Sequence, residues 1–108
     1  MKWKVGKSDI HGNGIFAADD IDVNEDIGIS IPLISETSNS LLYQRNTFGL
    51  LINDSKTPNA KTVKIGKDWH FEAIKHIDKD EEILVDYRNY EINIDIDSLT
   101  TGKKVSVI

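Results

Sequence analysis

The chain has 108 residues, a formal net charge of -5 at pH 7 and no cysteine. This length suits one small domain, and the missing cysteines exclude disulfide bonds and zinc sites built on thiolates. No stretch approaches the roughly 20 apolar residues of a membrane-spanning helix, and Met1–Val5 lacks the apolar core of a signal peptide. We therefore expect one domain, residues 1–108, with neither a membrane nor nucleic acid as a direct partner. Its expected location is the cytoplasm or, for a viral protein, the interior of the host cell including the nucleus.

Short alternating runs predict β-strands in the first third of the chain. Trp3–Lys7 alternates between apolar and polar residues, and 27–32 does so with a period of two until Pro32 ends it. Between them, the glycines of Gly12-Asn13-Gly14 predict a tight turn, since Gly and Asn accept positive φ. Such a turn either closes a plain hairpin or lets a ligand approach the main chain closely, because glycine has no Cβ.

Polar turns separate the elements expected in the middle of the chain. Residues 35–40 form a polar bridge, and 41–49 is compatible with a helical turn followed by an extended segment. Leu50-Leu51-Ile52 is typical of a short strand that runs into the polar stretch 53–59. There Pro58 and the Asn, Asp and Ser side chains predict a rigid loop.

The second half of the chain is also expected to be β-rich. Residues 61–67 and 69–74 alternate around Gly66 and predict a hairpin, with Trp69 and Phe71 in the core. The strict alternation of 90–97 predicts a further strand, and 103–108 predicts the last one.

Three segments resemble the motifs of SET-domain protein-lysine methyltransferases. Ser8–Ala17 resembles the opening motif Ser-x-Ile-His-Gly-x-Gly-Ile/Leu-Phe-Ala of that family. Asn53–Asn59 resembles the family's Asn-His-Ser signature that ends in Pro-Asn, with Asp54 in place of the usual His. Ala73–Tyr87 resembles the closing motif Ala-x-x-x-Ile-x-x-Gly-Glu-Glu-Ile/Leu-x-x-x-Tyr, with Asp80 in place of Gly. The chain is thus similar to the compact viral or bacterial type of SET domain, which carries no large insert and no cysteine-rich zinc segment.

The resemblance implies a mainly β SET-domain fold. Its small β-clip-like sheets would carry few short helical turns, and the C-terminal segment would thread a loop as a pseudoknot that joins the Asn53 and Tyr87 motifs. The implied cofactor is S-adenosyl-L-methionine, and no metal is implied. The residues implied to bind the cofactor are His11, Gly12, Asn13, Gly14, Asn53 and Asp54.

Methyl transfer to lysine requires a neutral amine in line with the donor, although free lysine has a pKa of roughly 10.4. A narrow apolar channel lowers that pKa by desolvation. The resemblance implies that Tyr87 is catalytic and that its hydroxyl orients the amine. Val85 stands where the family commonly has Phe or Tyr, and on one strand it would share a face with Tyr87 and leave room for more than one methyl group. The residues implied to line the substrate channel are Tyr43, Phe48, Val85 and Tyr90.

Nine acidic residues against three basic ones lie in 72–97, and an acidic rim near Tyr87 would favour a basic protein or peptide substrate. The expected function is an S-adenosylmethionine-dependent protein-lysine N-methyltransferase. Because Asp54 replaces a His whose ring could pack against adenine, a catalytically silent module that binds basic peptides is the alternative. A plain β-rich structural domain is a third hypothesis. The missing channel wall would come from Tyr90 and the tail, or from the second copy in a homodimer.

Overall fold

The computed structural model describes all residues from 1 to 108 and contains ten strands and two helices. Strand residues make up 44% of the chain and helical residues 19%, which confirms the mainly β expectation. Neither helix has the length and apolar character that crossing a membrane requires. The expectation of short helical turns alone is wrong, because α2 extends over 15 residues.

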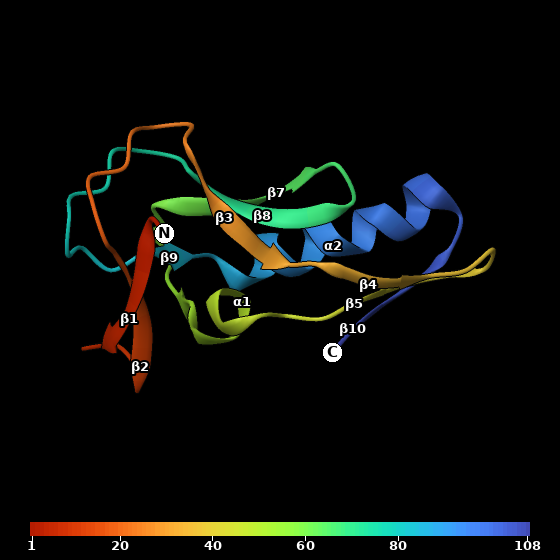
Figure 1. The fold of residues 1–108 in the computed structure, drawn as a ribbon, viewed down its shortest axis with the longest axis horizontal. Coiled ribbons are helices and arrows are strands. Elements are labelled where there is room, and N and C mark those ends of the chain that lie inside the picture. Colours follow the sequence, from red (N-terminus) through yellow and green to blue (C-terminus); the bar gives the residue numbers. More distant parts are fainter.

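The strands form four small sheets (Figure 1). The first is an antiparallel hairpin of β1 (Trp3–Lys7) and β2 (Asn13–Ala17). The second has the order β3 (Asp26–Ile31), β8 (Asp68–Ala73), β7 (Ala60–Ile65). The third has the order β10 (Lys104–Val107), β5 (Ser40–Tyr43), β4 (Leu33–Glu36). In the fourth, β6 (Asn53–Asp54) runs parallel to β9 (Leu84–Val85), and the helices are α1 (Thr47–Leu51) and α2 (Tyr87–Thr101).

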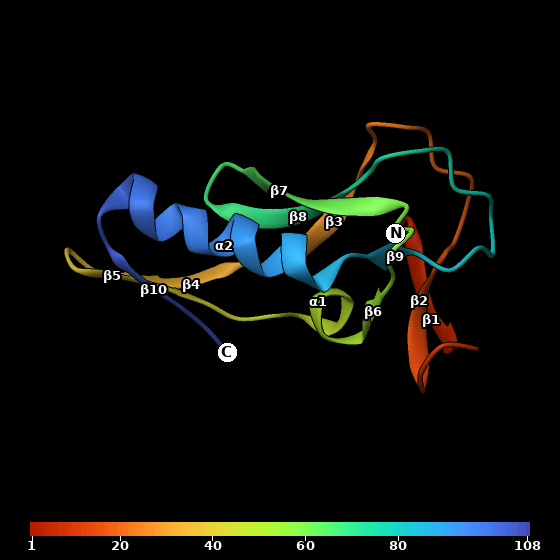
Figure 2. The same cartoon turned by 180° about the vertical axis from the view of Figure 1, so that it is seen from behind.

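The core lies between these sheets and α2, which packs against β7 and β10 (Figure 2). A row of aromatic rings runs through it. Phe48 stacks on Trp3 and meets Phe71 edge-on, with both ring centroids 4.9 Å away, and Phe71 contacts Tyr90 at 5.7 Å. The burial of Trp69 and Phe71 confirms their predicted place in the core.

Most of the predicted strands are confirmed, but the order of elements in 41–52 is not. The strand β5 comes first, and a helical turn, α1, follows it. The side chain of Asn46 accepts a hydrogen bond from the backbone N–H of Gly49 at 3.0 Å and so caps α1. Leu50 and Leu51 therefore end a helix instead of forming a strand.

The predicted strand at 90–97 is wrong, because these residues lie within α2. The side chains of Tyr90, Ile94 and Asp97 are buried, at the spacing of one helical face, whereas Ile92 and Ile96 are exposed. Asp86 caps the start of the helix, and Gly102, with φ 69°, ends it in the left-handed conformation. Asp86 and Gly102 are therefore the sequence signals for this helix, but the alternation of isoleucines between them favoured a strand.

Two turns of the same construction meet at an isolated bridge between Ile21 and Ile77. Their backbone groups exchange two hydrogen bonds, of 2.9 and 2.8 Å. Asn24 and Asp80 occupy matching positions in the turns, with φ of 68° and 72°. Because Asn and Asp tolerate the left-handed region better than other non-glycine residues, Asp80 preserves the backbone shape at a position where the motif has Gly.

Candidate active site

The pairing of β6 with β9 brings together two segments that lie far apart in the sequence. Asn53 is in register with Leu84, and Asp54 with Val85. Asn59 strengthens the junction, since its side chain donates to the Glu82 carbonyl oxygen at 2.9 Å and accepts from the Leu84 N–H at 2.8 Å. The Asn53 loop therefore lies directly beside the segment that leads to Tyr87. Threading of the chain as a pseudoknot stays a prediction.

Tyr87 is the first residue of α2 and is held at both ends. Its hydroxyl donates to the Ile52 carbonyl oxygen at 2.6 Å, and its backbone N–H donates to the Asp54 carboxylate at 2.8 Å. Burial, assisted by the negative charge of Asp54, raises the pKa of the Tyr87 hydroxyl. The hydroxyl is therefore neutral at physiological pH and can act as a hydrogen-bonding group.

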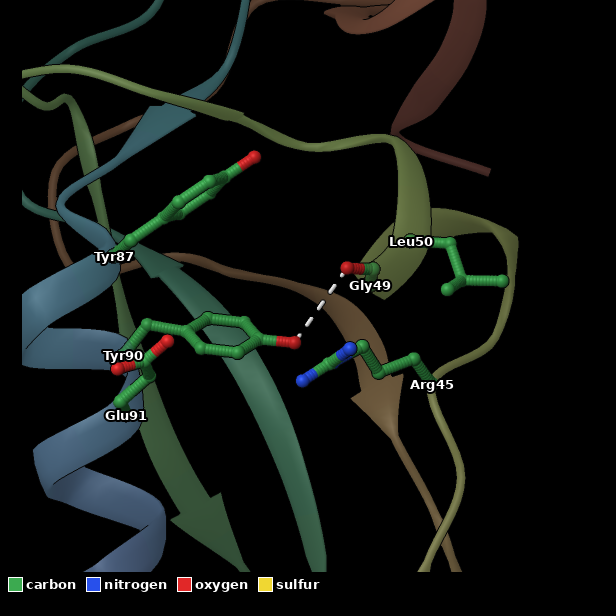
Figure 3. Close-up of a pocket in the computed structure, with 6 residues that line it drawn as sticks. All are labelled: Arg45, Gly49, Leu50, Tyr87, Tyr90 and Glu91. Atoms are coloured by element: carbon green, nitrogen blue, oxygen red, sulfur yellow. Dashed lines mark hydrogen bonds between the residues drawn. The ribbon is translucent and has the colours of Figure 1, made fainter. Parts of the chain in front are cut away.

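Tyr87 and Tyr90 line a cavity of about 190 Å³ (Figure 3). Their ring centroids are 6.3 Å apart, and the Tyr90 hydroxyl makes a long contact of 3.5 Å with the Gly49 carbonyl oxygen. The Arg45 guanidinium lies 5.8 Å from the centroid of the Tyr90 ring. Leu50 and Glu91 complete the lining, so the cavity offers two aromatic rings, one cation and one carboxylate.

The segment 11–14 lies against the Asn53 side chain. The Asn53 amide nitrogen donates to the His11 carbonyl oxygen at 3.1 Å and makes a longer contact, of 3.5 Å, with that of Asn13. Gly12 has φ 47° and open space where a Cβ would lie, so a ligand can approach its main chain. A Cβ on Gly14, in contrast, would clash with the side chains of Glu82 and Asn53, so packing within the protein already requires this glycine.

The acceptor groups around Asn53 fit the amino end of the implied cofactor. The side-chain oxygen of Asn53 accepts no hydrogen bond within the chain. The buried side-chain nitrogen and oxygen atoms that lack a hydrogen-bond partner belong to Arg45, Thr62 and Trp69. The Asn53 oxygen also lacks a partner but is not among them, so it keeps some access to solvent. A ligand amine could therefore donate to it. The Asp54 carboxylate, in contrast, is already bound to the Tyr87 N–H.

The overall fold of the chain resembles that of a solved structure over most of its length. The crystal structure of a Plasmodium falciparum protein, described as a "putative histone methyltransferase", matches with a TM-score of 0.59 and 30% sequence identity. The match covers 80% of this chain and 92% of that one. The chain belongs to the SET-like methyltransferase fold family. No family model and no curated protein matches the sequence.

Within the SET-like fold, only one of the four predicted channel residues, Tyr90, shares a cavity with Tyr87. Phe48 is wholly buried between Trp3 and Phe71 and is a core residue. The Tyr43 hydroxyl donates to Asp97 at 3.0 Å. Asp97 follows Tyr87 by ten residues on α2, which corresponds to about 15 Å along the helix. Tyr43 therefore lies apart from the candidate site.

The predicted shared face of Val85 and Tyr87 is wrong. β9 ends at Val85, Asp86 caps the helix, and Tyr87 already belongs to α2. Val85 is buried and lines a different cavity, of about 160 Å³, together with Tyr90. The argument that Val85 leaves room for several methyl groups beside Tyr87 therefore fails, because strand alternation does not extend across the helix cap.

The predicted acidic rim is also interrupted, because seven of the nine carboxylates are bound by partners within the protein. Only Asp86 and Glu91 adjoin Tyr87 or its cavity on the helix side. The seven bound carboxylates are Glu72 with Lys61, Asp78 with His76, Asp80 with Lys4, Glu81 with Asn59 and the Asp78 N–H, Glu82 with Ser8 and Asn53, Asp86 with Arg88, and Asp97 with Lys64 and Tyr43.

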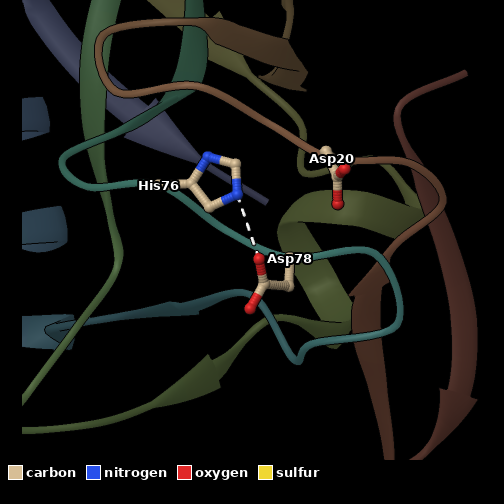
Figure 4. Close-up of side chains that lie close together, drawn as sticks. All are labelled: Asp20, His76 and Asp78. Atoms are coloured by element: carbon tan, nitrogen blue, oxygen red, sulfur yellow. Dashed lines mark hydrogen bonds and ion pairs between the residues drawn. The ribbon is translucent and has the colours of Figure 1, made fainter.

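A separate polar cluster lies on the loops that follow β2 and β8 (Figure 4). The potential ligand atoms of Asp20, His76 and Asp78 lie within 4.8 Å of one another, and all three residues are exposed. The His76 ring is 3.0 Å from Asp78 and 3.5 Å from Asp22. Desolvation lowers the pKa of His76, but hydrogen bonds to Asp78 and Asp22 and the nearby negative charges outweigh it and raise the pKa. A protonated His76 therefore partly neutralises these carboxylates.

The structure places at the site two residues, Glu82 and Arg45, that were not among the predicted site residues. Glu82 is the second Glu of the closing motif, but its contact with Asn53 requires the two segments to meet. Arg45 lies in a stretch without any motif, and only packing brings its guanidinium over Tyr90. No local sequence signal identifies Arg45.

Proposed function

We propose that the chain is an S-adenosylmethionine-dependent protein-lysine N-methyltransferase with Tyr87 as its catalytic residue. The observation that carries this proposal is the position of the Tyr87 hydroxyl. The hydroxyl donates a hydrogen bond to the carbonyl oxygen of Ile52, the residue before Asn53. The ring of Tyr87 lines a cavity together with Tyr90. One tyrosine therefore connects the segment that fits a cofactor to a cavity that suits an extended side chain. The SET-like fold supports the same assignment.

The cofactor would be held by the main chain of 11–14 and by the Asn53 side chain. When bound, it supplies a methyl group on a positively charged sulfur. Asn53 offers its side-chain oxygen as an acceptor, and Gly12 leaves the backbone open to close approach. These residues bind and orient, and they require no change of charge during the reaction.

The cavity residues would prepare the lysine. The rings of Tyr87 and Tyr90 would shield the amine from part of the surrounding water, and this desolvation disfavours its charged form. The positive charge of Arg45 acts in the same direction. The amine then loses its proton to solvent before it attacks, and the neutral Tyr87 hydroxyl orients it by hydrogen bonding. Tyr87 need not act as a base, which agrees with its raised pKa.

The proposed substrate is a lysine side chain of a basic protein or peptide. Glu91 lines the cavity, whereas Asp86 lies outside it and is paired with Arg88. Glu91 would attract a flanking Lys or Arg residue. Assembly as a homodimer also remains a proposal, and light scattering of the purified chain measures it.

The deciding experiment combines cofactor titration with methyl transfer. Calorimetry should give saturable binding of S-adenosylmethionine, and mass spectrometry should detect methyl-lysine on a mixture of basic proteins. The alternative, a silent module that binds basic peptides, gains support from Asp54, whose carboxylate is engaged by the Tyr87 N–H. Peptide binding without any cofactor binding at millimolar concentration would establish that alternative and end the enzyme proposal.

A further inference from the structure

Glu82 is a half-buried carboxylate without a basic partner. Both of its oxygens lie 2.8 Å from the Ser8 hydroxyl, and one lies 2.9 Å from the Asn53 amide nitrogen. No Lys, Arg or His forms an ion pair with it. Its negative charge is therefore compensated by neutral donors alone, at the point where the segments 8–14, 53–54 and 81–83 meet.

This carboxylate fixes the orientation of the Asn53 amide. An ionised carboxylate and a main-chain carbonyl only accept hydrogen bonds, so both Glu82 and His11 require the amide nitrogen of Asn53 to face them. The amide oxygen must then point away from both groups, where it has no partner within the chain. A flipped Asn53 amide would lose the hydrogen bonds to both Glu82 and His11. If Glu82 were absent, the flip would cost only the hydrogen bond to His11. Glu82 thus strengthens the preference, shared with the His11 carbonyl, for the orientation that presents the oxygen.

We infer that Glu82 is a positioning residue that makes the Asn53 site specific for a positively charged amine. The Asn53 side-chain oxygen, which has no partner within the chain, supplies the acceptor, and the negative charge of Glu82, which has no basic partner, makes the local potential negative. This inference rests on the proposed function, in which the amine is the ammonium of the cofactor's amino-acid part. That ammonium keeps its charge when the methyl group leaves, so Glu82 strengthens binding of cofactor and demethylated product equally.

The test is the variant Glu82→Gln, which keeps the size of the side chain, removes the charge and can donate to Asn53 through its own amide. Calorimetry should measure three probes: S-adenosylmethionine, S-adenosylhomocysteine and 5′-methylthioadenosine, which lacks the amino-acid part. We expect about tenfold weaker binding of the first two, because the negative potential at their ammonium group and the fixed orientation of the Asn53 oxygen are both lost. Binding of 5′-methylthioadenosine should stay within about twofold, since it has no ammonium to lose.

The matched control is Glu81→Gln, which makes the same change of charge at the adjacent residue. Glu81 contacts the Asp78 N–H at 3.1 Å and the Asn59 side chain at 3.4 Å, and it does not contact Asn53. The Glu81→Gln variant should bind all three probes with the affinity of the wild type. Thermal melting of both variants reports whether they fold.

Two results would overturn the assignment. In the first, folded Glu82→Gln binds S-adenosylmethionine like the wild type. In the second, all three probes lose affinity by the same factor, so that Glu82 acts only through the fold. Neither result contradicts the proposed function, because the wild-type protein binds the cofactor in both cases. A wild type that binds neither S-adenosylmethionine nor S-adenosylhomocysteine removes the proposed function and the inference together.

Discussion

The Asp54 carboxylate accepts a hydrogen bond from the backbone N–H of Tyr87 at 2.8 Å. The residue that departs from the SET motif thus satisfies one of the free N–H groups at the start of α2. Asp86 satisfies another, because its carboxylate accepts from the Arg88 N–H at 3.0 Å. Two negative charges at a helix N-terminus also interact favourably with the helix dipole. Asp54 therefore helps to position the helix that carries Tyr87.

Removal of this contact should destabilise the protein. We expect Asp54→Ala to lower the free energy of unfolding by about 1 kcal/mol, the typical effect of losing a helix cap. Asp54→Asn keeps an acceptor oxygen and should retain most of the stability. Urea unfolding of both variants checks this, and equal stability of Asp54→Ala and the wild type would show that the hydrogen bond contributes nothing.

Tyr87→Phe tests the catalytic assignment. The variant should fold with a loss of about 1 kcal/mol, because it lacks the hydroxyl that bonds to Ile52. It should bind the cofactor normally and lose most methyl transfer. The control is Tyr90→Phe, in which a contact of only 3.5 Å disappears, so its rate should change less. A rate for Tyr87→Phe equal to that of the wild type would exclude Tyr87 as the catalytic residue.

The pH dependence of methyl transfer should depend on Arg45. Its guanidinium lines the cavity and disfavours a protonated lysine there. We expect Arg45→Met to move the rising limb of the pH-rate profile to higher pH, because the amine then holds its proton more tightly. Arg88→Met is the control, since Arg88 is exposed and pairs with Asp86 outside the cavity. Superimposable profiles for Arg45→Met and the wild type would contradict this role.

Tyr43 should affect stability and leave catalysis unchanged. Burial, together with the hydrogen bond to Asp97, raises the pKa of Tyr43 and keeps its hydroxyl protonated. Tyr43→Phe leaves the buried Asp97 carboxylate with Lys64 alone, and we expect a loss of about 1 to 3 kcal/mol of unfolding free energy. The methylation rate of the folded variant should match the wild type. If Tyr43→Phe slowed methyl transfer without lowering the stability, Tyr43 would have a role in the substrate channel and this prediction would be wrong.

His76 should make the folded state more stable in mild acid than above neutral pH. Its pKa is raised in the folded protein, so the stabilisation is complete below the unfolded value of about 6.5 and is lost as the pH rises through the higher folded value. His76→Gln should remove this part of the pH dependence of the melting temperature over the range that begins near the unfolded value and extends above it. Parallel melting curves for variant and wild type over this range would exclude the effect.

The sequence by itself determined the class of fold and the meeting of two segments. Turn residues such as Gly66 and strict alternation specify local hairpins, and burial of one face fixes the register of β7 and β8. The motifs that contain Asn53 and Tyr87 resemble a family in which those motifs meet, and the structure pairs β6 with β9 as expected. Such features are set by neighbours in the chain or by a family pattern, so they can be predicted without coordinates.

Only the tertiary structure decided which residues surround Tyr87. The alternation of Ile92, Ile94 and Ile96 fits a strand, but burial of Tyr90, Ile94 and Asp97 against the sheets selects a helix. Because Tyr87 belongs to this helix and Val85 does not, the two residues line different cavities, and Tyr90 lies beside Tyr87. Arg45 and Glu82 enter the site through contacts with residues distant in the chain. The physical reason is that packing of a whole core overrides local periodicity, and no pattern within one segment records which other segment covers it.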